Sequence, residues 1–264
     1  MEIDGAEAVV TGASGGLGGA IARAMHARGA RVILTARREE SLRKLSTELN
    51  GADVIVCDLA DRKQVSGLVT RLVQTDIVVF NAALPAAGRL DDFTPEQVDR
   101  ALDVNLRVPM LMTQQLLPAM LERRHGHFVY ISSMAGKVPS VRQSVYSAAK
   151  FGLRGFCGAL RGDLHGSGVS ASAVFPEAIN DAGMLADFGI PLPPGMKGVS
   201  SVAVARAVIA AIEKDRGEVD AARFPVRLAG KLGGLAPGLT DRMTRRPAHI
   251  AWIETGVERS RHLR

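Results

Sequence analysis

The chain has 264 residues and is 47% hydrophobic, which is enough for one large α/β domain with a core of its own. Its two cysteines, Cys57 and Cys157, are too few for a disulfide framework or a thiolate metal cluster, so we expect buried free thiols in a reducing compartment. The net charge of +6 comes entirely from residues 223–264, because the rest of the chain is neutral. The sequence has no signal-like start and no run of about 18 apolar residues, which predicts a cytoplasmic protein without a membrane span.

Strand and helix patterns alternate along the first two thirds of the chain. The strands are short, nearly continuous apolar runs, which is typical of a parallel sheet buried on both faces. Their alternation with helices through short links predicts one doubly wound α/β domain over residues 1–222, followed by a basic C-terminal extension over 223–264. We expect strands at 6–11, 31–35, 53–57, 76–80, 127–131 and 170–175, and helices at 16–28, 39–49, 62–73, 95–124 with a bend at Pro109, 144–165 and 201–214.

A glycine-rich turn joins the first strand to the first helix, in the run Thr11-Gly-Ala-Ser-Gly-Gly-Leu-Gly18. Gly12, Gly16 and Gly18 let the backbone turn sharply and approach a ligand closely. The helix that follows offers free N–H groups and the positive end of its dipole to a phosphate. Between a strand and a helix the cluster predicts a dinucleotide site, although its spacing differs from the common G-x-G-x-x-G.

The second strand ends in Thr35-Ala-Arg-Arg38, at the position where a dinucleotide fold selects its cofactor. The guanidinium groups of Arg37 and Arg38 suit the 2′-phosphate of NADP(H). We therefore expect NADP(H) to be preferred over NAD(H). The alternative is that both arginines pair with Glu39, Glu40 or solvent.

Tyr146 and Lys150 lie four residues apart in the run Ser144-Val-Tyr-Ser-Ala-Ala-Lys150. If this run is helical, both side chains lie on one face, about one turn apart. The ammonium group would then stabilise phenolate and lower the tyrosine pKa from about 10, making the phenol a proton donor or acceptor near neutral pH. The same spacing also arises when a surface lysine extends past a half-buried tyrosine.

Together these motifs resemble the short-chain dehydrogenase/reductase (SDR) family over roughly residues 6–220. The motifs that carry the resemblance, in order, are Thr11-Gly-x-x-x-Gly-x-Gly18, Asn81-Ala82, Asn105, Ser133 and Tyr146-x-x-x-Lys150. The resemblance implies a Rossmann-type fold and an oxidoreductase that interconverts a ketone or aldehyde and an alcohol. It implies that Tyr146 is the general acid or base and that Lys150 lowers its pKa and holds the nicotinamide ribose. It also implies that Ser133 binds the substrate oxygen and that Asn105 anchors a water that relays protons to Lys150.

The resemblance also implies which residues line the cofactor. Asp58, directly after the third strand, would accept a hydrogen bond from the adenine amino group, or else it caps a helix before Asp61. The residues expected to bind the cofactor are Gly12, Ser14, Gly15, Gly16, Leu17, Gly18, Arg37, Arg38, Asp58, Leu59, Asn81, Ala82, Tyr146, Lys150, Pro176, Ala178 and Ile179.

Two stretches depart from the family's pattern. The usual Asn-Asn-Ala-Gly after the fourth strand is Phe80-Asn-Ala-Ala83 here, and Ala83 narrows the space beside the cofactor slightly. The usual Pro-Gly, with a threonine five residues after the proline, is replaced by Pro176-Glu177 and Asp181. Because these two acids would lie near a polyanionic cofactor, we expect its binding to be weaker or differently ordered.

Prolines and glycines interrupt the pattern over residues 177–200, directly after the sixth strand. At this carboxyl edge a mobile substrate lid is the natural interpretation, with a plain connecting loop as the alternative. An apolar carbonyl substrate is expected from the candidate pocket walls, although the same residues could pack on the core. These walls are Leu84, Met134, Val138, Val141, Met184, Leu185 and Phe188.

The basic extension allows three interpretations. It could pack on the domain or on a dimer partner, or it could touch an anionic membrane through residues 224–246 to collect an apolar substrate. Nucleic-acid binding is disfavoured because aromatic residues are not interleaved with the basic ones. Trp252 fits a subunit contact better than a membrane boundary. The leucines at helical spacing are Leu228, Leu232, Leu235 and Leu239.

The sequence therefore predicts an NADP(H)-dependent oxidoreductase that acts on a small-molecule carbonyl compound or alcohol and needs no metal. The alternative is a nucleotide-binding regulatory or scaffold protein that keeps the fold without turnover, supported only by Glu177 and Asp181. The family resemblance also implies a homodimer or homotetramer, formed through the helices that carry Asn105 and Tyr146.

Overall fold

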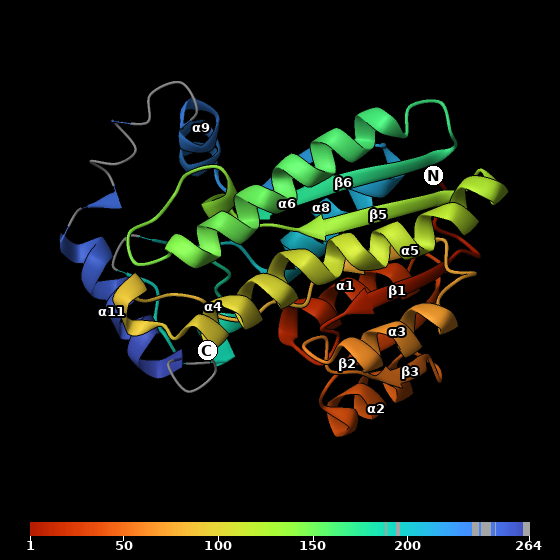
Figure 1. The fold of residues 1–264 in the computed structure, drawn as a ribbon, viewed down its shortest axis with the longest axis horizontal. Helices are drawn as coiled ribbons and strands as arrows, with labels where there is room; N and C mark the ends of the chain where they lie inside the picture. The colour runs from red at the N-terminus through yellow and green to blue at the C-terminus, as the bar shows by residue number, and fades with distance from the viewer. Residues whose placement is uncertain (188, 194–195, 234–237, 239–243, 246, 261–264) are drawn as a thin grey trace.

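The protein forms a seven-stranded parallel sheet covered by helices on both faces (Figure 1). The structure is a computed structural model and describes residues 1–187, 189–193, 196–233, 238, 244–245 and 247–260. The strand order is β3-β2-β1-β4-β5-β6-β7, with every neighbouring pair parallel. The strands are β1 (Glu7–Thr11), β2 (Arg31–Ala36), β3 (Asp53–Val56), β4 (Ile77–Phe80), β5 (Gly126–Ile131), β6 (Val169–Pro176) and β7 (Glu218–Ala221).

Two hydrophobic layers hold the helices against the sheet. One layer joins α1, α2 and α8 to one face, and the other joins α3, α5 and α6 to the opposite face. This arrangement confirms the expected doubly wound α/β fold. The helices are α1 (Gly16–His26), α2 (Glu39–Glu48), α3 (Arg62–Arg71), α4 (Pro95–Leu102), α5 (Val108–Arg123), α6 (Ser144–Asp163), α7 (Met184–Asp187), α8 (Ser201–Glu213), α9 (Phe224–Leu232) and α11 (Pro247–Ser260).

The composition led to expectations about the cysteines and about membrane spans. Cys57 and Cys157 are buried free thiols, as expected. Among the residues that the structure describes, no helix is long and apolar enough to cross a bilayer.

The strand order reverses between β1 and β4, and β4 is the central strand of the sheet. β1 pairs with β2 on one side and with β4 on the other, so the connections after β1 and β4 diverge at their carboxyl ends. In open α/β sheets this divergence leaves a crevice in which ligands bind. The fold therefore places the glycine turn after β1 and the polar ends of β4, β5 and β6 around one crevice.

The long helix expected over 95–124 is divided into three parts. α4 begins with a capping box between Thr94 and Gln97, and a π-helical turn at Asp103–Arg107 separates it from α5. Pro109 lies in the first turn of α5 and has no N–H, so it cannot donate the usual helical hydrogen bond to the carbonyl of Asn105. The expected interruption is confirmed, but it lies in the turn before the proline because the lost hydrogen bond lies there.

Strand β7 was not expected from the sequence. Its residues, Glu-Val-Asp-Ala, are half polar and exposed or half-buried except for Ala221. Only pairing with β6 makes this segment a strand, and its two acids bind cations from other elements. Nothing in its own pattern distinguishes it from a polar loop.

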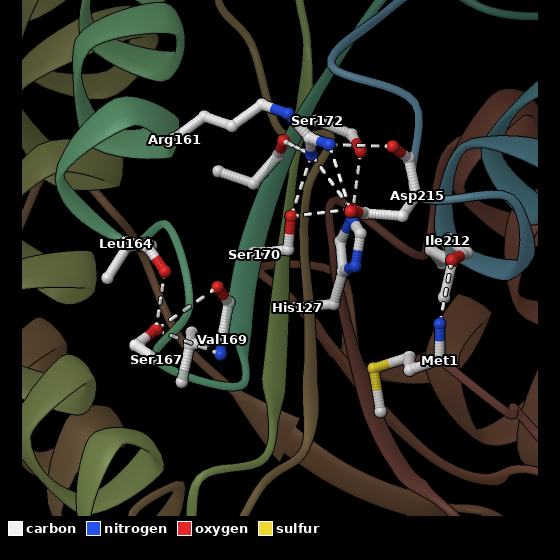
Figure 2. A network of polar contacts seen from close by, with 11 residues as sticks. Met1, His127, Arg161, Leu164, Ser167, Val169, Ser170, Ser172, Ile212 and Asp215 are labelled. Carbon is white, nitrogen blue, oxygen red and sulfur yellow. Dashed lines mark hydrogen bonds and ion pairs between the residues drawn. The ribbon is translucent and has the colours of Figure 1, made fainter.

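A polar network closes the amino edge of the sheet, opposite the crevice (Figure 2). The Arg161 guanidinium donates to both carboxylate oxygens of Asp215 at 2.8 and 2.9 Å and to the Ser170 hydroxyl at 2.7 Å. His127 is buried on β5, with Nε2 2.8 Å from the Ser172 hydroxyl. Burial lowers the pKa of His127 to about 4, despite the opposing effect of Asp215.

Acid is therefore expected to destabilise the protein through His127. An unfolded histidine titrates near pH 6.5, whereas folded His127 titrates near 4, so below pH 6.5 the unfolded chain binds a proton that the folded chain does not. Stability is complete above pH 6.5 and is lost as the pH falls toward 4. We expect about 2 kcal/mol of unfolding free energy to be lost between pH 7 and pH 5, measured by urea denaturation.

His127→Gln removes the titrating group and should flatten this dependence between pH 7 and pH 5. His165→Gln makes the same change at an exposed position, and this variant should keep the pH dependence of stability. An identical loss in all three proteins would show that another group causes it. The pKa of Asp215 is lowered to about 2, chiefly by its hydrogen bond to Arg161, so its contribution is lost only at lower pH.

Candidate active site

A cavity of about 1560 Å³ opens at the carboxyl edge of the sheet. Single small-molecule pockets are usually about 300–1,000 Å³, so this one has room for two ligands side by side. Every residue that the sequence predicts to bind the cofactor lines it, as does Ser133, while Asn105 lies just behind its wall.

The glycine turn is shaped by close backbone contacts. Gly12 has a φ of +67°, and a Cβ there would meet the Cα of Ala82 at 2.9 Å. A Cβ on Gly16 would meet Ala182 at 2.7 Å, so the segment after β6 lies directly over the start of α1. Gly15 caps α1 without any side-chain hydrogen bond, which leaves N–H groups of the first turn available for an anion.

Asn81 connects the ends of β1 and β4. Its side-chain amide donates to the carbonyl of Thr11 at 2.9 Å, and its backbone N–H donates to the Thr11 hydroxyl, also at 2.9 Å. The backbone N–H of Ala82 donates to the same hydroxyl at 3.0 Å. Asn81 thus lines the cavity while its amide holds the glycine turn in place.

Arg38 reaches from the end of β2 to the glycine turn. Its Nη2 donates to the carbonyl of Ser14 at 2.7 Å, and its side chain stays exposed at the cavity's edge. Arg37 is also exposed there. Pairing with the next two acids, one part of the alternative, is wrong because those acids bind residues of the following turn, whereas exposure to solvent, its other part, holds for Arg37. The pairs are Glu39–Arg43 at 2.5 Å and Glu40–Lys44 at 2.8 Å.

Asp58 stabilises the turn between β3 and α3. Its Oδ1 accepts from the backbone N–H of Ala60 at 3.0 Å, while its own N–H donates to the Gln64 side chain. The helix cap is Asp61, which accepts from the N–H groups of Lys63 and Gln64. Asp58 lines the cavity beside Leu59, so its place is compatible with the predicted adenine contact.

Tyr146, Ser133 and Lys150 line the same cavity. The first turns of α6 place Tyr146 and Lys150 on one face, with Lys150 Nζ 5.5 Å from the tyrosine ring centre. The Ser133 hydroxyl accepts from the backbone N–H of Ala135 at 3.1 Å. Lys150 is buried and donates from Nζ to the carbonyl of Ile131 at 2.9 Å. The alternative of a surface lysine is therefore wrong.

The expected lowering of the Tyr146 pKa by Lys150 is also wrong in this structure. Burial raises the pKa of Tyr146 to about 12, and the nearby Ser133 side chain opposes this effect only in part. Burial also lowers the pKa of Lys150 to about 8. The removal of each group from water is therefore the largest cause of its pKa shift.

Asn105 lies in the π-helical turn and is fully enclosed. Its Oδ1 accepts from the N–H of Leu84 at 2.7 Å, and its Nδ2 donates to the carbonyl of Leu84 at 3.0 Å. Both ends of the amide therefore hold the loop after β4. Because Pro109 cannot donate to it, the backbone carbonyl of Asn105 is the group suited to accept a hydrogen bond from a water.

The two acids that depart from the family pattern do not face the cofactor cleft as free charges. The Glu177 carboxylate accepts from Arg223 Nε at 2.6 Å, and its side chain is only 5% exposed. Asp181 accepts from the backbone N–H of Ser201 at 2.8 Å and from its hydroxyl at 3.2 Å, at the start of α8. Both acids have internal partners, and the expected weaker or differently ordered cofactor binding stays a prediction.

The segment after β6 is fastened at its base. Ile179 and Val199 form a parallel bridge, with the N–H of Val199 donating to the carbonyl of Ala178 at 2.9 Å. Five of the expected pocket walls line the cavity, Val141 is not among its lining residues, and Phe188 lies outside the described residues. The five confirmed walls are Leu84, Met134, Val138, Met184 and Leu185.

Lys137 is a site residue that the sequence did not reveal. It follows Ser133 by four residues, and its Nζ is buried between Asp220 Oδ1 at 2.5 Å and Glu218 Oε2 at 2.8 Å. The ammonium group also lies 4.1 Å from the centre of the Phe175 ring. These contacts tie the loop that carries Ser133 to β6 and β7, and no short sequence signal predicts them.

The basic extension contributes part of the cavity wall, which the sequence did not predict. α11 lines the cavity with His249, Trp252 and Ile253, and the Trp252 indole N–H donates to the carbonyl of Pro191 at 2.8 Å. His249 Nε2 lies 3.1 Å from the Ser140 hydroxyl. The described parts of the extension thus pack on the domain, which is one of the three interpretations. Leu235 and Leu239 lie outside the described residues.

Known proteins are similar to this chain in sequence and structure. A family model described as short chain dehydrogenase matches residues 6–189. Dehydrogenase/reductase SDR family member 7B of Bos taurus is 33% identical over 256 residues, covering 89% of this chain and 79% of that protein. Ketoacyl reductase HetN of Nostoc sp. is 32% identical over 257 residues, covering 92% of this chain and 89% of that one.

A solved structure of a ketoreductase is also similar to this chain. The crystal structure of an actinorhodin polyketide ketoreductase variant with NADPH has a TM-score of 0.74 and 30% sequence identity, covering 83% of this chain and 96% of that one. Fold, site geometry and sequence similarity therefore agree. The chain belongs to the short-chain dehydrogenase/reductase family of nicotinamide-dependent oxidoreductases that act on CH–OH and C=O groups.

Proposed function

We propose that this protein is an NADP(H)-dependent reductase of an apolar ketone or aldehyde, with Tyr146 as the proton donor. The observation that carries the proposal is the convergence of Ser133, Tyr146 and buried Lys150 on the cavity that the glycine turn also lines. This arrangement supplies two hydroxyl donors to one carbonyl oxygen next to a dinucleotide site.

Ser133 and Tyr146 would both bind the carbonyl oxygen of the substrate. Both hydroxyl groups would donate to the carbonyl oxygen and stabilise the negative charge that develops there. With a pKa of about 12, Tyr146 is fully protonated at neutral pH and is ready to donate. Lys150, with a pKa of about 8, remains mostly charged and could resupply the proton.

The cavity fits a dinucleotide cofactor. The uncapped start of α1 and the turn at Gly12–Gly18 would hold the pyrophosphate, and Asp58 would contact the adenine. Lys150 would hold the nicotinamide ribose. A bound NADPH supplies the hydride for the carbonyl carbon. The exposed guanidiniums of Arg37 and Arg38 support the preference for a 2′-phosphate.

Arg38→Gln is expected to raise the Kd for NADPH by about tenfold to a hundredfold, because it removes a charge-assisted contact to the 2′-phosphate. The Kd for NADH should change by less than about threefold, since NADH lacks that phosphate. Lys44→Gln removes the same charge from the neighbouring helix and should leave both constants unchanged. An equal loss of NADPH and NADH affinity in Arg38→Gln would show that the arginine only supports the glycine turn.

The substrate side of the cavity is largely apolar, which supports a hydrophobic carbonyl compound. The test is NADPH oxidation by purified protein with a panel of ketones and aldehydes that range from small and polar to large and apolar. Turnover that increases with apolar size supports the proposal. Tight NADPH binding without turnover on any compound would instead favour a regulatory protein that keeps the fold.

We further propose that the chain forms a homodimer or homotetramer through α5 and α6. Met110 on α5 and Phe151 on α6 are large apolar side chains that remain exposed in a single copy. The predicted division into a catalytic domain at 1–222 and an extension from 223 stays a prediction as well. The cavity contacts of α9 and α11 support an extension that works as part of the site.

A further inference from the structure

Helix α9 has two faces with different roles. Its inner face packs on the loop that carries Ser133, since a Cβ on Gly233 would meet Val138 at 2.8 Å. Val226 and Ala229 on this face line the substrate cavity. Arg223, directly before the helix, is bound to buried Glu177 at 2.6 Å, which fixes the start of α9 to the domain. The orientation of the helix is therefore set by the fold.

The outer face of α9 carries an apolar stripe. Phe224, Leu228 and Leu232 recur every four residues and are 75%, 44% and 41% exposed. Residues at this spacing lie on one side of a helix. Soluble proteins expose single large apolar side chains, but a continuous row of three on one helix indicates a binding surface.

Cations border this stripe. Arg227 and Lys231 lie one turn apart on the same outer side and are exposed. Among the described residues, neither forms an ion pair with an acid, in contrast to Arg223. They belong to the extension that carries the whole net charge of +6, while the rest of the chain is neutral. The outer face of α9 thus combines exposed apolar side chains with positive charges that no acid in the described part of the chain neutralises.

We propose that α9 binds an anionic lipid bilayer, with Phe224, Leu228 and Leu232 in the headgroup region and Arg227 and Lys231 at the lipid phosphates. Apolar residues beside basic ones on one helix face are the features by which helices lie in a membrane surface. Because the opposite face of the same helix lines the cavity, the bilayer would meet the protein beside the substrate site. An apolar carbonyl compound dissolved in the lipid could enter from there. This delivery role rests on the proposed function, whereas membrane binding does not.

A second copy of this chain is a poorer occupant of the same face. A symmetric contact through α9 would place Arg227 and Lys231 near the same cations of the other copy, and like charges repel. A bilayer with anionic headgroups offers opposite charge to the cations and an apolar interior to the stripe.

The test is co-sedimentation of the full chain with vesicles of phosphatidylcholine and phosphatidylglycerol in equal parts, compared with pure phosphatidylcholine. We expect binding to the anionic vesicles, weakened at high salt. Two variants separate the apolar contribution to binding from the electrostatic one. The apolar variant is Phe224→Ser/Leu228→Ser/Leu232→Ser, and the charge variant is Arg227→Gln/Lys231→Gln. Each should lower the partition coefficient by about tenfold or more. Leu90→Ser/Val202→Ser changes equally exposed apolar residues elsewhere and should bind like the unaltered chain.

Thermal unfolding of each variant shows whether it is folded. Equal pelleting of all variants would overturn the proposal, and so would loss of binding only in the charge variant, which would indicate an electrostatic patch without insertion. Absence of pelleting together with a dimer that the apolar variant dissociates would assign the face to a second copy. Sedimentation needs no turnover, so pelleting by a protein that reduces no ketone would refute the proposed function and leave the membrane surface standing.

Discussion

Replacing Tyr146 with phenylalanine is expected to lower kcat for ketone reduction by about a thousandfold. The variant loses the hydroxyl that would donate a proton to the carbonyl oxygen, while the ring and its packing remain. Lys150 and the glycine turn are unchanged, so the Kd for NADPH should stay within about threefold of the unaltered value. Stopped-flow or steady-state NADPH oxidation measures the first quantity, and nicotinamide fluorescence measures the second.

Tyr130 provides a matched control, since the chain has only two tyrosines. Its hydroxyl is fully buried and lies 2.7 Å from the Thr113 hydroxyl, away from the cavity lining. Tyr130→Phe should lower the unfolding free energy by about 1 kcal/mol, because it removes one buried hydrogen bond, and should keep kcat within about twofold. A Tyr146→Phe variant with more than about a tenth of the original kcat would exclude Tyr146 as the essential proton donor.

Replacing Lys137 with methionine is expected to lower the unfolding free energy by about 3 kcal/mol. Methionine fills similar space without charge, and it leaves the Asp220 carboxylate, whose side chain is 8% exposed, without its cation. Glu218 keeps its second partner, Arg154, at 2.6 Å, so Asp220 should account for most of the loss. Urea denaturation at pH 7 measures this difference.

The variant Lys137→Met/Asp220→Asn tests that explanation, because it removes the unpaired charge along with its partner. It should recover at least about half of the lost stability. Lys44→Met changes an exposed lysine and should alter stability by less than about 0.5 kcal/mol. No recovery in the double variant would mean that Lys137 acts through packing on Phe175. Because Lys137 holds the loop of Ser133, kcat should fall more than the NADPH affinity does.

The connection between Lys137 and Ser133 illustrates how the site is supported. The loop after β5 is held by Lys137 on the side of β7 and by the Ser132 hydroxyl, which donates to the carbonyl of Lys150 at 3.0 Å. A direct hydrogen bond therefore joins the loop after β5, which carries Ser133, to α6, which carries Tyr146 and Lys150. Their relative position depends on the packing of three separate elements.

The sequence alone determined the features that depend on short-range patterns. The alternation of apolar strands and amphipathic helices identified the doubly wound fold, because each element shows its own periodicity. The glycine turn and the Tyr146–Lys150 spacing predicted residues that the structure brings to one cavity. Both motifs lie at the junctions of neighbouring elements, where local geometry already fixes their direction.

Only the tertiary structure decided what those residues face. Glu177 finds its partner 46 residues away and Ser140 finds His249 109 residues away, so neither contact leaves a trace in any local pattern. The pKa of Tyr146 followed burial rather than its neighbour four residues on, because the removal of water depends on the whole surrounding chain. The polar strand β7 and the cavity wall formed by α11 also depend on contacts with residues that are distant in the sequence. Pairing and burial that arise from distant residues are physical effects that no single stretch of sequence contains.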